Sequence, residues 1–269
     1  MLRAQNRCFE ESMMKPILDT PALVVKNDVK TLVIADLHLG IEYDLYKSGI
    51  RIPSQTQKQL ARLIGYIEKT DPDRLLLLGD VKHNVPLISY QERGDVPRFL
   101  GELAKHAPID IVPGNHDGGM DFLIPKGTDI TLHSSRGILR DDIGYFHGHA
   151  WPSAKLISAK HVVMAHNHPA VRFTDPLGYV SIVPAWIRTH FDENVVRQHY
   201  SLANKEISEC VTIMPAFNEL CGGIPFNEAS HEDLLGPVST SGAIKLESAE
   251  AYLLDGTHIG KIRDLRRLR

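Results

Sequence analysis

Five short apolar runs in this chain each end in a polar cluster, and this repeated arrangement constrains the fold more than any other feature. The most distinctive run, 109–112, is followed by the turn Pro-Gly-Asn-His-Asp-Gly-Gly at 113–119. The other runs are 31–35, 75–78, 143–146 and 162–165. α/β proteins place binding and catalytic groups at the carboxyl ends of buried strands. We therefore expect an α/β protein in which the five strand ends meet.

The first half of the chain alternates predicted strands with predicted helices. Its predicted strands are 22–25 (an edge strand), 31–35, 75–78 and 109–112. Apolar residues at helical spacing predict helices over 54–69 and 96–105, and 40–53 is expected to be a loop. The order strand, helix, strand, helix, strand is typical of a parallel βαβ core.

The second half contains short apolar runs with little helix between them. These runs are 130–132, 137–139, 143–146, 162–165, 180–183, 185–188 and 211–214. Short strands that follow one another without helical crossovers predict a second, mixed sheet.

Four segments describe the expected domain organisation. Residues 1–15 are polar and lack periodicity, which predicts a flexible tail in front of one domain over 16–269. Residues 222–243 are rich in Gly, Ser, Pro, Asn and Glu, which predicts a mobile loop. Residues 251–262 contain an Asp-Gly turn between apolar runs, which predicts a C-terminal hairpin.

Composition excludes several classes of protein. No apolar run approaches the length of a membrane span, so we expect no membrane segment. The formal net charge of −3 argues against a globally basic coat for nucleic acid, although local patches remain open. The three cysteines are too few and too scattered for a disulfide framework, which predicts a reduced, cytoplasmic protein. Fourteen histidines are present, and several of them follow predicted strands.

The side chains at the strand ends form an inventory of possible metal ligands. They are Asp36, His38, Asp80, Asn115, His147, His166 and His168, with His116 left over. A mixed nitrogen and oxygen set suits Mn²⁺, Fe²⁺, Ni²⁺ or Zn²⁺. Seven ligands are too many for one ion that also holds water, whereas two ions that share one carboxylate use all seven.

Two such ions, ~3.5–4 Å apart, clamp both oxygens of an in-line displacement at phosphorus. A histidine beside the pair, but not bound to it, can protonate the leaving oxygen. His83 and His149 are open between two interpretations: each either orients a ligand or is an ordinary loop residue.

These clusters resemble the signature of the calcineurin-like metallophosphoesterase family. The matching motifs are DLH at 36–38, GD at 79–80, GNHD at 114–117, HGH at 147–149 and AHNH at 165–168. Their order and spacing match over 31–170, with one departure at Ala165, where the family usually has glycine. The resemblance implies a four-layer sandwich in which two mixed β-sheets are flanked by helices.

The resemblance also implies roles, residue by residue. Asp36, His38 and His168 would hold the first ion, Asp80 would bridge, and Asn115, His147 and His166 would hold the second. His116 would donate the proton and stabilise the phosphate oxygens. Apart from the resemblance, His83, Asp117 and His149 are candidates for supporting the ligands from outside.

Within the family, the chain is similar to archaeal phosphoesterases related to the break-repair nuclease subunit and to the bacterial ligase-associated DNA-damage-response endonuclease. This similarity implies Mn²⁺-dependent cleavage of phosphodiesters, with DNA as substrate and a DNA helicase as partner. Two alternatives stay open: a phosphatase or phosphodiesterase for a nucleotide or other small phosphoester, and a catalytically silent interaction module like the one in the retromer coat.

The intact ligand set argues against a silent module. A nuclease needs an open groove with basic walls, whereas a small-molecule enzyme needs an enclosed pocket. The motifs are not separated by an insertion large enough to form a cap, which favours an open site. Candidate basic residues for the groove are Lys47, Arg51, Lys82, Arg172 and Arg188.

Overall fold

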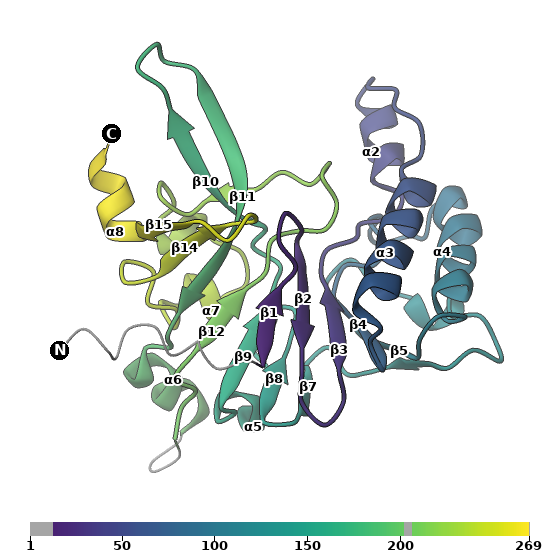
Figure 1. The fold of residues 1–269 in the computed structure, drawn as a ribbon, viewed down its shortest axis with the longest axis horizontal. Helices are drawn as coiled ribbons and strands as arrows, with labels where there is room; N and C mark the ends of the chain where they lie inside the picture. The colour runs from purple at the N-terminus through teal and green to yellow at the C-terminus, as the bar shows by residue number, and fades with distance from the viewer. Residues whose placement is uncertain (1–12, 202–205, 269) are drawn as a thin grey trace.

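The computed structural model describes residues 13–201 and 206–268, which form two β-sheets with helices on both outer sides (Figure 1). The first sheet has the order β1-β2-β3-β4-β5-β6, in which β1, β2 and β3 pair antiparallel and β3 to β6 pair parallel. Its strands are β1 (Met14–Pro16), β2 (Ala22–Val25), β3 (Thr31–Ile34), β4 (Arg74–Leu78), β5 (Ile109–Val112) and β6 (Ile130–Leu132).

The second sheet is mixed and has the order β13-β10-β11-β12-β9-β8-β7, with β14 paired to both β11 and β15. Its strands are β7 (Ile138–Arg140), β8 (Ile143–Tyr145), β9 (His161–Met164), β10 (Pro169–Thr174), β11 (Val180–Thr189), β12 (Val211–Ile213), β13 (Ile224–Pro225), β14 (Glu250–Leu253) and β15 (His258–Lys261). The β14–β15 pair lies where the sequence predicted a hairpin.

The α-helices are α2 (Ile41–Lys47), α3 (Thr56–Thr70), α4 (Tyr90–Leu103), α5 (Ala154–Ile157), α6 (Glu193–Tyr200), α7 (Pro237–Thr240) and α8 (Ile262–Leu265). Short 3₁₀ turns occupy Met120–Phe122, His231–Asp233 and Arg266–Leu268. In the described part of the chain, none of the helices is both long and apolar enough to cross a bilayer.

Alternation along β4 shows how the layers form. Leu75 and Leu77 pack against α3 and α4, whereas Leu76 and Leu78 pack against residues of the second sheet. Successive side chains of a strand point to opposite faces, so a strand that is apolar throughout must be covered on both. On the outer face of the second sheet, α5, α6 and α7 cover a third apolar cluster. The result is the expected four-layer sandwich of two mixed sheets flanked by helices.

Helix α2 corrects the prediction of a loop over 40–53. Only its first turn is buried, at Ile41 and Glu42, and most of its remaining side chains are exposed. The Glu42 carboxylate anchors it by accepting from the Gln55 backbone N–H at 2.5 Å. A helix held at one end has no apolar stripe, and periodicity therefore does not detect it.

Three further predictions differ from the structure. Residues 14–16 form the edge strand β1, so the predicted tail is too long and β2 is not at the edge; residues 1–12 lie outside the described residues. Residues 130–132 were predicted to belong to the second sheet, but they form β6, which pairs parallel with β5 in the first sheet. A short apolar run does not specify which sheet it joins.

The third difference is the segment 222–243, which packs against the second sheet instead of standing away from it. Phe226, Leu234 and Val238 are buried there. The segment contains β13 and α7, and α7 begins with Pro237 in its first turn, where proline is favourable. Its few, widely spaced apolar residues are enough to hold it, although the composition resembles a loop.

Candidate metal centre

The ligand candidates come from the carboxyl ends of strands in both sheets. In the first sheet, Asp36 follows β3 and Asp80 follows β4, and the two loops are joined by hydrogen bonds from Asp36 N–H to Gly79 O (3.2 Å) and from His38 N–H to Asp80 O (2.8 Å). In the second sheet, His147 follows β8, and its carbonyl accepts from Ala165 N–H at the end of β9 (2.9 Å). Parallel pairing brings each set of strand ends to one edge, and the packing of the sheets brings the two edges together.

The candidate atoms fall into two groups that share one carboxylate. One group is Asp36, His38 and Asp80, and the other is Asp80, His147 and His166; the ligand atoms within each group lie within 4.8 Å of one another. With bonds of ~2.0–2.3 Å, ligands on opposite sides of one ion are at most about 4.6 Å apart. The 4.8 Å limit is close to this span, so each group is compact enough for one metal site, and Asp80 belongs to both. We call these residues, together with His168, the metal centre.

The backbone holds these residues in an unfavourable conformation. Among the described residues, ten non-glycine positions have positive φ, and five of them are Asp36 (56°), His38 (43°), Asp80 (50°), His166 (71°) and His168 (41°). Left-handed backbone at residues other than glycine is uncommon and tends to cluster where surrounding structure imposes it for function. The turns thus aim the side chains inward at a cost in local backbone energy.

The imidazoles are oriented by hydrogen bonds on their outer nitrogens. His147 Nδ1 donates to Leu78 O and His168 Nδ1 donates to Gly222 O, each at 3.2 Å. In the described chain, the Nε2 atoms of His38, His147 and His168 are buried and have no hydrogen-bond partner, and neither has the Asp36 carboxylate. Metal-binding histidines are held in this way, with one nitrogen engaged and the other free for the ion.

His38 is oriented through a chain of two further side chains. Its Nδ1 lies 3.1 Å from Nδ1 of His83, whose Nε2 lies 3.3 Å from the Asp44 carboxylate on α2. Since a carboxylate only accepts, His83 Nε2 carries a proton and His83 Nδ1 accepts from His38. Burial lowers the pKa of His83, followed by the nearby His116, and burial lowers the pKa of His38 to about 3. Both rings are therefore neutral, and His38 Nε2 is left unprotonated with a free lone pair.

The carboxylates attract positive charge strongly. Asp36 is 0% exposed and Asp80 is 2% exposed, and in residues 13–201 and 206–268 neither forms an ion pair with lysine or arginine. Burial would raise the pKa of both carboxyls, but interactions with His168 at Asp36 and with His147 at Asp80 hold both below their usual range.

The histidine pKa values report the same attraction. Burial would lower the pKa of His147, but Asp80 raises it to about 9. Asp36 likewise outweighs burial to raise the pKa of His168. His166 lacks such a partner, and burial, followed by repulsion from His147, lowers its pKa to about 4. Buried carboxylates that pair with imidazoles and, among the described residues, with no lysine or arginine fit a pair of divalent ions, which would take the place of the imidazole protons.

Two glycines allow the strand ends to approach this closely. A Cβ on Gly79 would lie 2.0 Å from Nδ1 of His147, and a Cβ on Gly114 would lie 2.1 Å from Oδ1 of Asp80. No side chain fits at either position while the ligands stay in place.

The turn after β5 places the other candidates. His116 N–H donates to Asp80 Oδ1 at 2.9 Å, and His116 Nδ1 hydrogen-bonds to the carbonyl of His83. Asp117 accepts from the N–H groups of Gly114 (2.8 Å) and Lys82 (3.1 Å), so it holds the turn, and burial raises its pKa to about 6. Asn115 is exposed on this turn and its assignment as a ligand stays a prediction.

His149 lies outside the ligands, with its ring 5.4 Å from that of His147 and 6.2 Å from that of His166. It is half-buried, and burial, followed by repulsion from His147, lowers its pKa. These distances place it around the metal centre, as the interpretation that it orients a ligand requires; its function stays a prediction.

Of the five basic residues proposed for a groove, two are buried, one is paired with a carboxylate and two are exposed. Lys82 is buried, and its ammonium donates to Asn84 O (2.6 Å) and to His116 O, which makes it a structural residue. Arg188 is also buried, and Arg172 pairs with Glu228 at 3.1 Å. Lys47 and Arg51 are exposed. Whether a basic residue is buried depends on how the loops and strands pack, and its position in the sequence does not reveal this.

Two residues near the metal centre were missed. Asp44 lies in the segment that was predicted to be a loop, and Cys221 lies far beyond the last motif, on the loop that follows β12. Neither carries a local signal, since only the folded chain brings them to His83 and to His38 and His168.

Comparisons with known proteins identify a family and similar solved structures. A family model described as calcineurin-like phosphoesterase matches residues 29–212, which contain every predicted ligand. The crystal structure of the Pseudomonas putida nuclease MPE is similar at 20% identity and a TM-score of 0.52, covering 90% of this chain and 97% of that one. YfcE, a phosphoesterase from E. coli, matches at 18% identity and a TM-score of 0.35, over 54% of this chain and 73% of its own. The first likeness shows a shared fold.

Proposed function

This chain belongs to the calcineurin-like phosphoesterase family and is therefore a metal-dependent hydrolase of phosphoesters; on that premise we propose that it cleaves phosphodiester bonds in DNA, with Mn²⁺ as its most active ion. The observation that carries the proposal is the carboxylate of Asp80, which belongs to two ligand groups of metal-site size. A shared carboxylate between two such groups is what a two-ion phosphoesterase requires.

In this proposal, Asp36, His38 and His168 would hold the first ion, Asn115, His147 and His166 would hold the second, and both would share Asp80. When bound, two divalent ions supply Lewis acidity at the phosphoryl oxygens and a water nucleophile at neutral pH. A set of oxygen and nitrogen donors accepts Mn²⁺ as well as Fe²⁺, Ni²⁺ and Zn²⁺, and the family resemblance supports Mn²⁺ among them.

His116 gives its proton to the leaving oxygen. Its backbone N–H is bonded to Asp80, and its ring lies 4.9 Å from that of His38, which keeps it beside the reacting phosphate. Because Nδ1 donates to the carbonyl of His83, Nε2 is the atom that faces the leaving group, and it has a proton to give when the ring is an imidazolium. General acid catalysis of this kind contributes ~10²–10⁴-fold in rate.

DNA as substrate is supported by the surface of α2. Tyr43 and Tyr46 are exposed there, with Lys47 4.3 Å from the first ring centre and Arg51 5.7 Å from the second. Asp44 of the same helix contacts His83, so this surface adjoins the metal centre. Aromatic rings for bases beside cations for phosphates are typical of surfaces that bind single strands. A small phosphoester needs neither.

A smaller substrate remains the second candidate. A surface cavity beside His168, lined in part by Arg62 and Asn218, could hold a nucleotide-sized phosphoester. A helicase partner, implied by the resemblance, has no support in the matched family or in the similar structures and forms no part of the proposal.

A matrix of Mn²⁺, Mg²⁺ and Zn²⁺ against plasmid DNA, bis-p-nitrophenyl phosphate and p-nitrophenyl phosphate tests the proposal. We expect the two diesters to be cleaved, fastest with Mn²⁺. Cleavage of the monoester alone would favour the second candidate, and no turnover with any ion would contradict both.

The α2 surface is tested with the double variant Tyr43→Ala/Tyr46→Ala. Loss of stacking costs ~1–3 kcal/mol per base, so KM for single-stranded DNA should rise while the rate on bis-p-nitrophenyl phosphate stays unchanged. Tyr43→Phe/Tyr46→Phe is the matched control, since it keeps both rings. An equal effect of the alanine variant on the two substrates would show that α2 acts on the metal centre and not on DNA.

A further inference from the structure

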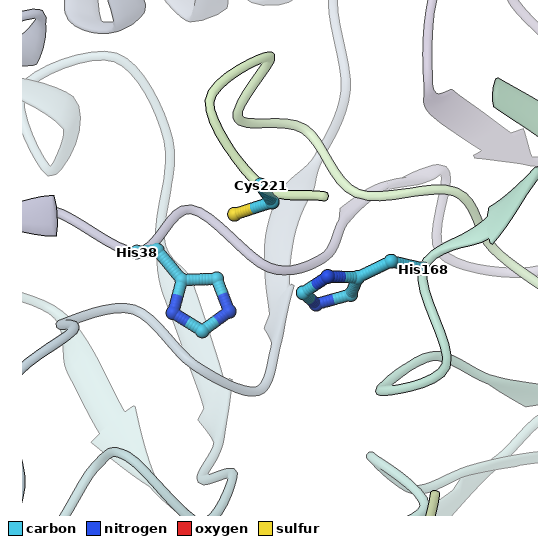
Figure 2. Close-up of side chains that lie close together, drawn as sticks. All are labelled: His38, His168 and Cys221. Atoms are coloured by element: carbon cyan, nitrogen blue, oxygen red, sulfur yellow. The ribbon is translucent and has the colours of Figure 1, made fainter. Parts of the chain in front are cut away.

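Cys221 lies beside the first metal position. Its sulfur and one nitrogen each of His38 and His168 lie within 4.8 Å of one another, the same limit that groups the predicted ligands. In the view of Figure 2, the sulfur lies above the space between the two imidazole rings.

The loop that carries Cys221 is tied to both histidine-bearing segments. On one side, Phe217 N–H donates to Ala35 O and the Asn218 side-chain amide donates to Leu37 O, each at 2.9 Å. On the other, His168 O accepts from Ile224 N–H at 3.1 Å and His168 Nδ1 donates to Gly222 O at 3.2 Å. These hydrogen bonds fix the backbone of the loop, and Cys221 is therefore held between His38 and His168.

A second, independent observation shows that this space is built for a cation. The Nε2 atom of His38 and both carboxylate oxygens of Asp36 are almost fully buried and, within the described chain, have no hydrogen-bond partner. Imidazole nitrogen, carboxylate oxygen and sulfur are the three donor types found in borderline-soft metal sites.

We propose that Cys221 is a sulfur ligand of the ion held by Asp36, His38 and His168. The proposal rests on the two-ion site of the proposed function and refines it. On binding, the S–H bond breaks, the proton goes to solvent, and sulfur donates the electron pair to the ion.

The two metal positions then differ in chemistry. The first has a nitrogen, oxygen and sulfur set, whereas the second, around Asp80, His147 and His166, has nitrogen and oxygen alone. Thiolate ligands select Zn²⁺, Co²⁺ and Fe²⁺ over Mn²⁺. The first position therefore prefers a softer ion, and Mn²⁺ competes best at the second.

Cobalt titration of the full chain, freed of metal, tests the ligand. The wild type should bind two Co²⁺ ions and show thiolate-to-cobalt charge-transfer absorption in the near ultraviolet. Cys221→Ser and Cys221→Ala should lose this absorption, and their Zn²⁺ affinity at one site should fall by at least the ~10–100-fold that loss of an outer partner costs. Cys210→Ala, at a buried thiol before β12, is the matched control and should keep the absorption.

A measurement on the wild type tests the same ligand even if the variants do not fold. Zn²⁺ should protect Cys221 of the wild type from alkylation, measured by mass spectrometry of its peptide. Two bound Co²⁺ ions without the charge-transfer band, a band that persists in Cys221→Ala, or no protection by Zn²⁺ would each overturn the ligand while the proposed function stands. A wild type that binds no Co²⁺ at all would overturn the two-ion site together with the ligand.

Discussion

Two regions of this protein hold buried carboxylates, and the charges of these carboxylates are neutralised in different ways. Asp110 of β5 is 2% exposed, like Asp80, and it pairs with Arg140 of β7 (2.7 Å), His133 (2.7 Å) and Arg74 (3.5 Å). We call these four residues the Asp110 network. Among the described residues, the carboxylates of the metal centre pair with imidazoles and with no lysine or arginine.

The difference shows which buried carboxylate serves the fold and which serves chemistry. Arginine stays protonated at any physiological pH, so Asp110 is neutralised by the chain itself and joins β5 of one sheet to β7 of the other. Imidazole can lose its proton and offer a lone pair instead. Asp36 and Asp80 are therefore left for a cation from solution, and the predictions below test this contrast.

The largest expected effect is that of Asp80→Ala. It removes the carboxylate shared by both ligand groups, so the protein should lose at least one ion and almost all activity. Asp110→Asn is the control from the other group: its specific activity and metal content should match those of the wild type, and its stability should fall. Metal analysis and rates on bis-p-nitrophenyl phosphate decide the matter. If Asp80→Ala binds two ions and turns over normally, the shared carboxylate has been misassigned.

A second comparison sets His116 against His133, the imidazole of the Asp110 network. His116→Asn and His116→Gln should lose ~10²–10⁴-fold in rate on DNA with metal content unchanged. The loss should be smaller on bis-p-nitrophenyl phosphate, whose leaving group hardly needs a proton, and His133→Gln should leave both rates unchanged. Equal losses on both substrates would indicate charge stabilisation at the phosphoryl oxygens, and loss of an ion would make His116 a ligand.

A third comparison uses two glycines of one turn. A Cβ at Gly114 would collide with Asp80 Oδ1, whereas a Cβ at Gly118 has nothing within 4 Å. Gly114→Ala should displace the shared carboxylate and lower kcat, by ~10²-fold if the shift approaches 1 Å. Gly118→Ala should behave like the wild type. Similar kinetics for the two variants would show that the turn tolerates movement of Asp80.

The smallest effect concerns acid stability in the Asp110 network. Burial would raise the pKa of Asp110, but His133 and Arg140 hold it below its usual 3.8. A carboxyl with a lowered pKa stabilises the fold above its unfolded value and loses this contribution as pH falls through the folded value. At pH 7, Asp110→Asn should be less stable by about 1–3 kcal/mol. This difference should shrink below about pH 4, as measured by urea unfolding; a difference independent of pH would contradict the ion-pair role.

The sequence by itself determined which strand ends carry polar side chains and that they would meet. Parallel pairing explains why Asp36, His38 and Asp80 lie together and why His147 and His166 do, whereas the packing of the two sheets brings these groups to each other. The same runs predicted a parallel core and a second, mixed sheet, whereas the four-layer sandwich was implied by the family resemblance.

The tertiary structure alone decided the rest, because it depends on contacts between distant segments. Lys82 resembles a groove residue in the sequence, yet the turn after β5 buries its ammonium. Strand β6 joined the first sheet, and α2 formed with only one buried turn. Cys221 reached His38 and His168 through a loop tied to both. Local pattern sets the strand and the side to which a residue points, whereas its neighbours across the sheets are set by packing.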